Sequence, residues 1–372
     1  MASMTPTGDF RASYRADMAL FPSKNSRRAV WFGILVALLL PLPALLVHWL
    51  PDQAELLSKV DIGRYGLGLL IQIGFLGIAA LGLNILVGFT GQISIGHAAF
   101  FGVGAFASAW LHERGLPVVF CIPLAGVVTA MVGTVFGLPA ARLKGLYLAI
   151  ATLAAQFIIE DFFARAQWFT GGVAGRGTEP FALAGVQFDR EESFFYVVLL
   201  AVIVMFTAAA NLMRTRDGRA LIAVRDHYLS AEMMGINLAY YRTLSFGIAS
   251  FYAGIGGALY AHYLQFVSVE AFNIGFSIQF LGMVIIGGLG SIMGSLMGAA
   301  FMVVLPEVVQ VGADALAGGS VDRALKLGAN ISFLRDMVVG AVIILFLLFE
   351  PDGLARRWHL IKAYWKLYPY SH

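Results

Sequence analysis

Charged residues and cysteine are scarce in this sequence, and both shortages narrow the class of protein that it encodes. Only 13% of the 372 residues are charged, 59% are hydrophobic, and the mean hydropathy is +0.80. A soluble domain carries about 25% charged residues. The single cysteine, Cys121, lies in an apolar stretch, which excludes an internal disulfide and a cysteine-based metal site. The composition predicts an integral membrane protein.

Catalytic and metal-binding motifs are also missing. The sequence has no GxxxxGKS/T phosphate loop, no HExxH, no CxxC and no GxSxG, and its seven histidines are scattered. The net charge of +3 comes without a basic stripe interleaved with aromatics, so we expect no nucleic-acid partner. We likewise expect no catalytic residue, no metal and no cofactor. If ATP drives the function, another chain hydrolyses it.

Apolar runs recur along the chain from Ala29 onward. A spanning helix needs roughly 20 apolar residues, and the alternation of a spanning β-barrel is absent. The sequence predicts an all-α integral membrane protein, a polytopic bundle of about ten transmembrane helices within residues 29–350, some of them broken by glycine. The predicted spans are 29–50, 65–88, 93–111, 118–140, 146–163, 194–212, 244–264, 274–292, 295–312 and 334–350. One of the pair 274–292 and 295–312 could instead be a re-entrant half-helix, because so few residues join them.

The distribution of positive charge predicts the orientation. With the N-terminus inside, the inside loops hold most of the 25 Lys and Arg residues. We therefore expect a cytoplasmic N-terminal segment (1–28), a cytoplasmic loop (213–243) and a cytoplasmic C-terminal tail (351–372). The external loop 164–193 contains FTGGVAGRGTEP, whose Gly and Pro content favours ordered turns over a helix.

The stretch GFTGQISIGHAAFFGVGAF, residues 88–106, interrupts an apolar run with glycine and polar side chains. Glycine lets a helix break, and the exposed backbone groups must then find partners or line an aqueous cavity. IIGGLGSIMGSLMGAAF repeats the pattern later, as transporter repeats do. The alternatives are close packing for the glycines and local hydrogen bonding for the polar side chains. The candidate pathway or hinge residues are Gly88, Gly91, Gln92, Ser94, Gly96, His97, Gly287, Gly288, Gly290 and Gly294.

Ionisable residues within the predicted spans are few. Glu160, Asp161, Glu307 and Asp336 lie near predicted helix ends, where their carboxylates can reach interfacial water. A stand-alone ion-coupled secondary transporter requires a carboxylate near the midplane of the membrane. That class is therefore the less favoured alternative.

The loop 213–243 has a helical pattern. Its apolar positions recur at three- and four-residue steps: Leu221, Val224, Tyr228 and Ala231. Gly235 can end this helix in the left-handed conformation, and Asn237 can cap the next one. We predict a short cytoplasmic helix that contacts a partner, with an interfacial helix resting on anionic lipid as the alternative.

Four blocks in order resemble the permease subunits of branched-chain amino-acid-type ABC importers, specifically the M-type subunit. They are GLNILVGFTGQISIGHAAFFGVGAF, LKGLYLAIATLA followed by FTGG, GRALIAVRDHYLSAEMMGIN, and GALYAHYLQFVSVEAF with GGLGSIMGSLMGAAF. The resemblance extends from about Gly82 to Glu350. AAQFIIED and RDHYLSAE depart from the commoner patterns of the family, and the first departure leaves the substrate open.

The resemblance implies an ABC importer permease fold in the bacterial inner membrane, forming half of a translocation pathway. It also implies a second, H-type permease, two ATP-binding-cassette ATPases and a periplasmic binding protein that docks on outside loops such as 164–193 and 313–333. The substrate would be a branched-chain amino acid, or a related solute such as urea, an amide or an aromatic acid. By this resemblance the residues that transmit ATPase closure are Arg219, Arg225, Ala231, Glu232 and Gly235.

Overall fold

Helices make up most of the residues that the computed structural model describes, which are residues 24–41, 63–143, 145–183, 186–316, 327–350 and 352–367. The first half contains α2 (Lys24–Leu39), α5 (Gly63–Asn84), a short π-helix η2 (Ile85–Phe89), α6 (His97–Glu113), α7 (Val118–Ala140), α8 (Leu146–Arg165), α9 (Gln167–Thr170) and the 3-10 turn η3 (Gly172–Ala174). The second half contains α10 (Glu191–Leu212), α11 (Arg216–Asp226), α12 (Tyr228–Met233), α13 (Leu238–Leu264), the 3-10 turn η4 (Val269–Phe272), α14 (Ile274–Gly287), α15 (Ile292–Leu316), α17 (Leu327–Phe349) and α18 (Gly353–Leu367).

The core of the bundle is built around α5 and α13, whose surfaces are mostly buried, whereas α7, α10 and α15 expose most of theirs. α13 packs against α5, α6 and α7. Its approach to α6 requires glycine, because a Cβ on Gly104 would lie 2.4 Å from the Cα of Gly254. Small residues of this kind let two spanning helices approach through their backbones, as is usual in lipid. Aromatic rings fill the space between α6, α8 and α14.

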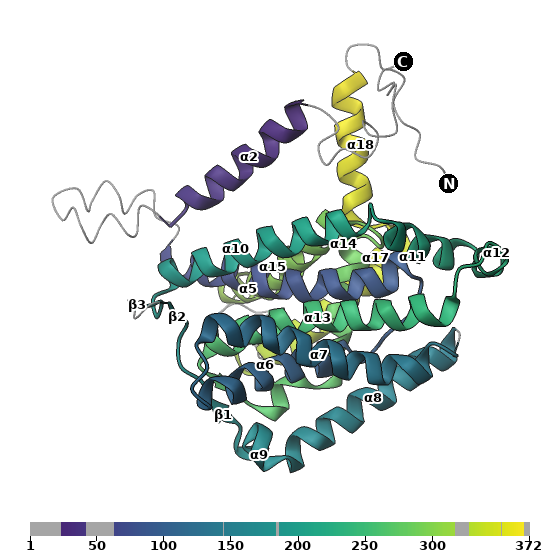
Figure 1. Ribbon diagram of the computed structural model, residues 1–372. Coiled ribbons are helices and arrows are strands. Elements are labelled where there is room, and N and C mark those ends of the chain that lie inside the picture. Colours follow the sequence, from purple (N-terminus) through teal and green to yellow (C-terminus); the bar gives the residue numbers. More distant parts are fainter. Residues whose placement is uncertain are drawn as a thin grey trace.

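The two ends of the bundle differ in structure (Figure 1). At one end lie α11 and α12, together with the end of α5 and the start of α13; we name this the α11–α12 end. At the opposite end the loops form two short antiparallel pairs, β1 (Arg176–Gly177) with β4 (Phe266–Val267) and β2 (Ala182–Leu183) with β3 (Val186–Gln187). The predicted ordered turns of loop 164–193 are therefore present, with the addition of the four-residue helix α9.

The all-α membrane class is confirmed, but the predicted count of about ten spans is higher than the described residues support. Six helices there are long and apolar enough to cross a membrane, or seven if the bent pair α17 and α18 forms one span. α14 has 14 residues, about 21 Å of helix, and a typical hydrocarbon core is about 30 Å thick. The break lies at residues 288–291, so the alternative of a half-helix describes α14 better than a full span does.

Several predicted segments fall partly outside the description. The structure describes α2 in place of the first half of the predicted span 29–50, and residues 42–62 lie outside the described ranges. Three further parts of predicted segments also lie outside the described ranges. They are residues 1–23 of the N-terminal segment, residues 317–326 of the outside loop, and residues 351 and 368–372 of the tail.

Candidate functional site

The helix α6 begins inside the bundle, because residues 91–96 run back from the α11–α12 end without helical structure. The first backbone N–H groups of a helix have no intrahelical acceptor, and in a membrane water cannot replace it. Here side chains from two other helices accept them. Ala98 N–H donates to Ser277 Oγ at 2.9 Å, and Ala99 N–H donates to Gln156 Oε1 at 2.9 Å. The break is therefore a built feature of the fold.

Gln156 of α8 contacts the starts of both α6 and α14. Besides accepting from Ala99, its amide nitrogen donates to the carbonyl oxygen of Phe272, just before α14, at 2.6 Å. Thr152, one turn earlier, accepts from Ile95 N–H at 3.0 Å. Gly96 fits against this helix only because it lacks a Cβ, which would lie 2.3 Å from the Thr152 carbonyl oxygen. Gln156 thus ties the starts of α6 and α14 to one point of α8.

The polar residues predicted in this stretch are buried and point into the chain itself. Gln92 donates from Nε2 to Ser245 Oγ of α13 at 2.6 Å, and His97 Nε2 lies 2.8 Å from the carbonyl oxygen of Ala79 in α5. The Gln92 Oε1 atom and the Ser94 hydroxyl are buried, and within the described ranges neither has a hydrogen-bond partner. Gln92 and His97 thus bond to other helices of the bundle rather than to the broken turn itself, and a pathway or hinge role for the set stays a prediction.

The two glycine-rich stretches meet at the α11–α12 end. Asn84, fully buried at the end of α5, accepts from Gly290 N–H at 2.8 Å and donates to the carbonyl oxygen of Ser291 at 2.8 Å. A Cβ on Gly88 would lie 2.0 Å from Asn84 Oδ1 and 2.3 Å from Gly290 N. The helices α14 and α15 also approach each other closely at Gly287 and Gly294, because a Cβ on Gly287 would lie 2.0 Å from the Gly294 carbonyl oxygen.

Arg225 of α11 connects the predicted coupling segment to both stretches. Its guanidinium donates to the carbonyl oxygen of Gly88 at 2.6 Å. Its aliphatic stem lies against Gly91, where a Cβ would be 3.0 Å from Arg225 Cγ, and its Nη1 lies 3.1 Å from the Cβ position of Gly290. Gly91 and Gly290 both have positive φ, 73° and 74°. One side chain of the coupling segment therefore touches each of the two glycine turns.

The predicted helix of the loop 213–243 is present as two helices, α11 and α12, separated at His227, which adopts an extended φ of −157°. A single continuous helix is therefore wrong at this residue. The predicted inner face is mostly right, because Leu221, Val224 and Ala231 are buried. The predicted stop and cap are confirmed: Gly235 has φ 84°, and Asn237 Oδ1 accepts from Tyr240 N–H at 3.1 Å.

The remaining residues of the predicted coupling set have different surroundings. Arg219 donates from Nη1 to the carbonyl oxygen of Arg214 at 3.0 Å and is exposed. Glu232 is exposed on α12, whereas Ala231 beside it is buried. The structure therefore brings Arg225 to the glycine turns and leaves Arg219, Glu232 and Gly235 on the outer surface. Arg219 and Glu232 are thus available to a partner.

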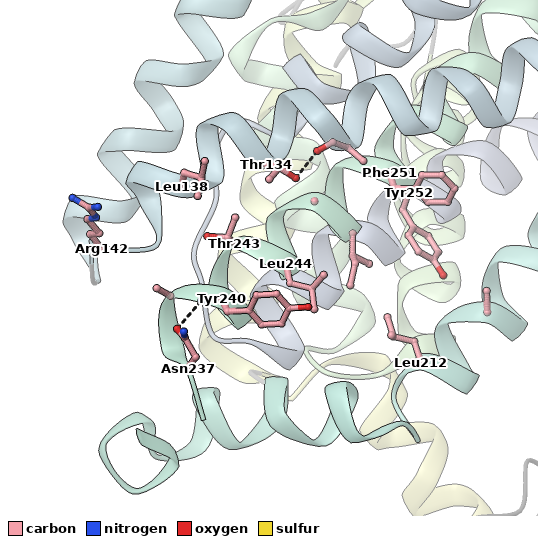
Figure 2. Close-up of a pocket in the computed structure, with 15 residues that line it drawn as sticks. Thr134, Leu138, Arg142, Leu212, Asn237, Tyr240, Thr243, Leu244, Phe251 and Tyr252 are labelled. Carbon is pink, nitrogen blue, oxygen red and sulfur yellow. Dashed lines mark hydrogen bonds between the residues drawn. The ribbon is translucent and has the colours of Figure 1, made fainter. Parts of the chain in front are cut away.

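A groove of about 860 Å³ opens between α7, α10 and α13 near the α11–α12 end (Figure 2). Its walls are apolar for most of their length, including Leu138, Leu244 and Phe251. Figure 2 labels Arg142 and Asn237 among the polar residues that line the groove. Arg142 is the one charged residue among the described lining residues, so the groove suits an apolar occupant better than a zwitterionic solute.

Three residues that hold the breaks were missed from the sequence: Asn84, Gln156 and Ser277. Each is an isolated polar residue in an apolar run, which is the signal that was available. In the part of the chain that the structure describes, no group of three or more His, Cys, Asp or Glu side chains is placed to hold a metal ion.

Comparison with known proteins now adds to this geometry. A family model described as "Branched-chain amino acid transport system / permease component" matches residues 65–347. The chain belongs to this family. The match covers both glycine turns, α11 and α12, and the helices that hold the half-helices in place. The resemblance inferred from the four sequence blocks is thereby confirmed at the level of the family.

Individual relatives carry the same description. The "High-affinity branched-chain amino acid transport system permease protein LivM" of Salmonella typhimurium is 30% identical over 314 residues, which are 78% of this chain and 66% of that protein. The Escherichia coli protein of that name is 28% identical over the same shares. A "Probable branched-chain amino acid transport permease protein LivM" of Methanocaldococcus jannaschii is 27% identical over 63% of this chain. The alignment thus spans slightly less than two thirds of the two bacterial relatives. No solved structure matches the chain significantly.

Proposed function

We propose that this chain is a permease subunit of an ATP-driven importer and forms half of the pathway for a branched-chain amino acid. The observation that carries the proposal is the contact of Arg225 with both glycine turns in a member of this permease family. Through this contact α11, which a partner protein can reach, is joined to the two glycine turns at which α5 and α14 end. Movement of α11 and α12 would therefore move the broken ends of α5 and α14.

The importer would consist of this chain, a second related permease of the H-type, two ATP-binding-cassette ATPases and a periplasmic binding protein. ATP hydrolysis belongs to the ATPases, and this chain supplies the mechanical link. The relatives' description as branched-chain amino acid permeases favours this substrate class over urea, amides and aromatic acids. It also favours the importer over a stand-alone ion-coupled transporter.

We assign the α11–α12 end to the cytoplasm of a bacterial inner membrane, with both termini on that side. Arginine clusters near this end, as the positive-inside rule requires. The described residues concerned are Arg142, Arg214, Arg216, Arg219, Arg225 and Arg242. At the opposite end, Arg165 and Arg176 are paired with the carboxylates of Asp161 and Glu113. That end is where a binding protein would dock.

The test is to purify this chain with the products of neighbouring genes and reconstitute the complex in liposomes. ATPase activity and uptake of radiolabelled L-leucine are measured with and without the binding protein. We expect both to rise when the loaded binding protein is added. Purification of the chain alone, with uptake driven by an ion gradient and indifferent to ATP, would contradict the proposal.

A further inference from the structure

A second pocket, of about 370 Å³, opens between α5, α13, α14 and α15 in the half of the bundle opposite α11 and α12. Much of its wall is apolar and aromatic, with Phe75, Leu76 and Phe276 among the lining residues. Five polar side chains also line it: Gln72, Tyr260, Tyr263, Gln279 and Glu307. Polar groups at such depth are rare in membrane proteins unless they serve a function.

Tyr263 donates from its hydroxyl to Glu191 Oε1 at 3.5 Å, whereas the other side-chain hydrogen-bond donors described in this pocket are unused. Among the described residues, the side-chain amides of Gln72 and Gln279 and the hydroxyl of Tyr260 have no hydrogen-bond partner. Each amide carries two N–H donors and the hydroxyl carries one. A polar group left unpaired in apolar surroundings costs free energy. A ligand with a carboxylate would satisfy donors from three different helices at once.

The acceptors lie on α15. The Glu307 carboxylate is half-buried and accepts from the hydroxyl of Tyr65, and a carboxylate has capacity for further donors. One residue earlier, Pro306 lacks an N–H, so the carbonyl of Met302 loses its helical donor. Both Met302 and Glu307 line the pocket. A cationic ammonium group placed here would meet one negative charge and a carbonyl that lacks its usual helical donor.

We propose that this pocket is a binding site for the zwitterionic head of an α-amino acid with a branched aliphatic side chain. Glu307 and the Met302 carbonyl would take the ammonium, Gln72, Gln279 and Tyr260 the carboxylate, and the aromatic walls the side chain. The described lining contains one acidic residue and no Lys or Arg, so a ligand that is only an anion is disfavoured. The inference rests on the proposed function and narrows it, because it selects amino acids over aromatic acids.

The sequence offers a clean chemical test, since its one cysteine, Cys121, is buried. A Val303→Cys variant places a thiol on the pocket wall while leaving the proposed ligand groups intact. The variant is reconstituted with its ATPase and permease partners and labelled with a small cationic methanethiosulfonate. We expect saturating L-leucine to slow labelling at least threefold. Neither 3-methylbutylamine, which lacks the carboxylate, nor 4-methylpentanoate, which lacks the ammonium, should do so.

A second variant tests the charge partner. Adding Glu307→Gln keeps an acceptor for Tyr65 but removes the negative charge, so about tenfold more leucine should be needed for the same protection. Asp161→Asn, an exposed carboxylate outside the pocket, is the matched control and should leave protection unchanged. Labelling that ignores leucine, or that both analogues slow as well as leucine does, would overturn the site. Leucine uptake is measured on the same complex. If leucine is taken up but does not protect the thiol from labelling, the proposed binding site is wrong and the proposed importer function stands.

Discussion

The guanidinium of Arg225 donates to the carbonyl oxygen of Gly88 at 2.6 Å, which joins α11 to the broken end of α5. The carbonyl belongs to η2, where the ordinary helical ladder is already interrupted. π-Helical turns of this kind are frequent at functional sites. The contact therefore links the predicted coupling segment directly to an irregular turn at the end of α5.

Replacing Arg225 should therefore separate ATP hydrolysis from transport. In Arg225→Gln the charged donor to Gly88 is lost, and a hydrogen bond to a charged group contributes about 1.5–3 kcal/mol. We expect leucine uptake by the reconstituted complex to fall about tenfold while ATPase activity persists. Arg216→Gln is the control, because Arg216 lies exposed on the same helix and its side chain has no hydrogen bond or ion pair among the described residues. Equal coupling in the two variants would contradict the role of Arg225.

The exposed surface of α12 makes a different prediction. Glu232 has its side chain in solvent, so Glu232→Ala should leave the chain folded and inserted. If its carboxylate contacts the ATPase, uptake per ATP hydrolysed should fall severalfold. The measurement is the ratio of leucine transported to phosphate released in liposomes. An unchanged ratio of leucine to phosphate would mean that Glu232 does not take part in coupling.

Gly235 tests the turn that follows α12. Its φ of 84° is strained for alanine, at roughly 1–2 kcal/mol, although the space around its Cβ position is open. Gly115, at the opposite end, has φ 89° and equally open space, which makes Gly115→Ala a matched control for backbone strain. We expect similar losses of thermal stability in the two variants and a loss of coupling in Gly235→Ala alone. Coupling that falls equally in both would trace the effect to stability.

Local signals in the sequence predicted a large part of this architecture, and non-local contacts explain what they missed. Gly91 and Gly96 indicated the break before α6, and Gly235 with Asn237 indicated the end of α12 and the start of α13, because turns and caps depend on neighbouring residues. The side chains that accept hydrogen bonds from the start of α6 could not be predicted from neighbouring residues. Gln156 lies 57 residues from Ala99, and Ser277 lies 179 residues from Ala98.

Hydropathy also predicted more spans than the described residues support, for a related reason. Hydropathy counts apolar residues, and it does not distinguish a full span from a half-helix such as α14. Glu307 illustrates the same limit. Its position in the sequence suggested an edge residue, and only the fold shows that it lines a pocket together with residues of α5, α13 and α14.

The contact between the two glycine turns predicts a large difference between two glycine-to-alanine variants. A Cβ at position 88 would overlap Asn84 Oδ1 and the backbone nitrogen of Gly290, so Gly88→Ala must displace backbone and should lower the melting temperature of the complex by several degrees. Gly312, in the helix α15, has no atom near its Cβ position. Gly312→Ala should be neutral or stabilising by about 0.5–1 kcal/mol, because alanine is the better helix former. Differential scanning fluorimetry of the purified complex compares them, and equal melting temperatures would argue against the contact.

Gln156 makes the last prediction, because it is the residue on which both half-helices depend. Gln156→Met keeps the length of the side chain and removes its hydrogen bonds, leaving Ala99 N–H and the Phe272 carbonyl without partners at about 1–3 kcal/mol each. We expect a lower melting temperature and faster amide exchange at the start of α6, with the far end of α6 less affected. Gln187→Met, at an exposed position of β3, should change neither. Unchanged exchange at Ala98 and Ala99 in Gln156→Met would mean that the start of α6 is held without this amide.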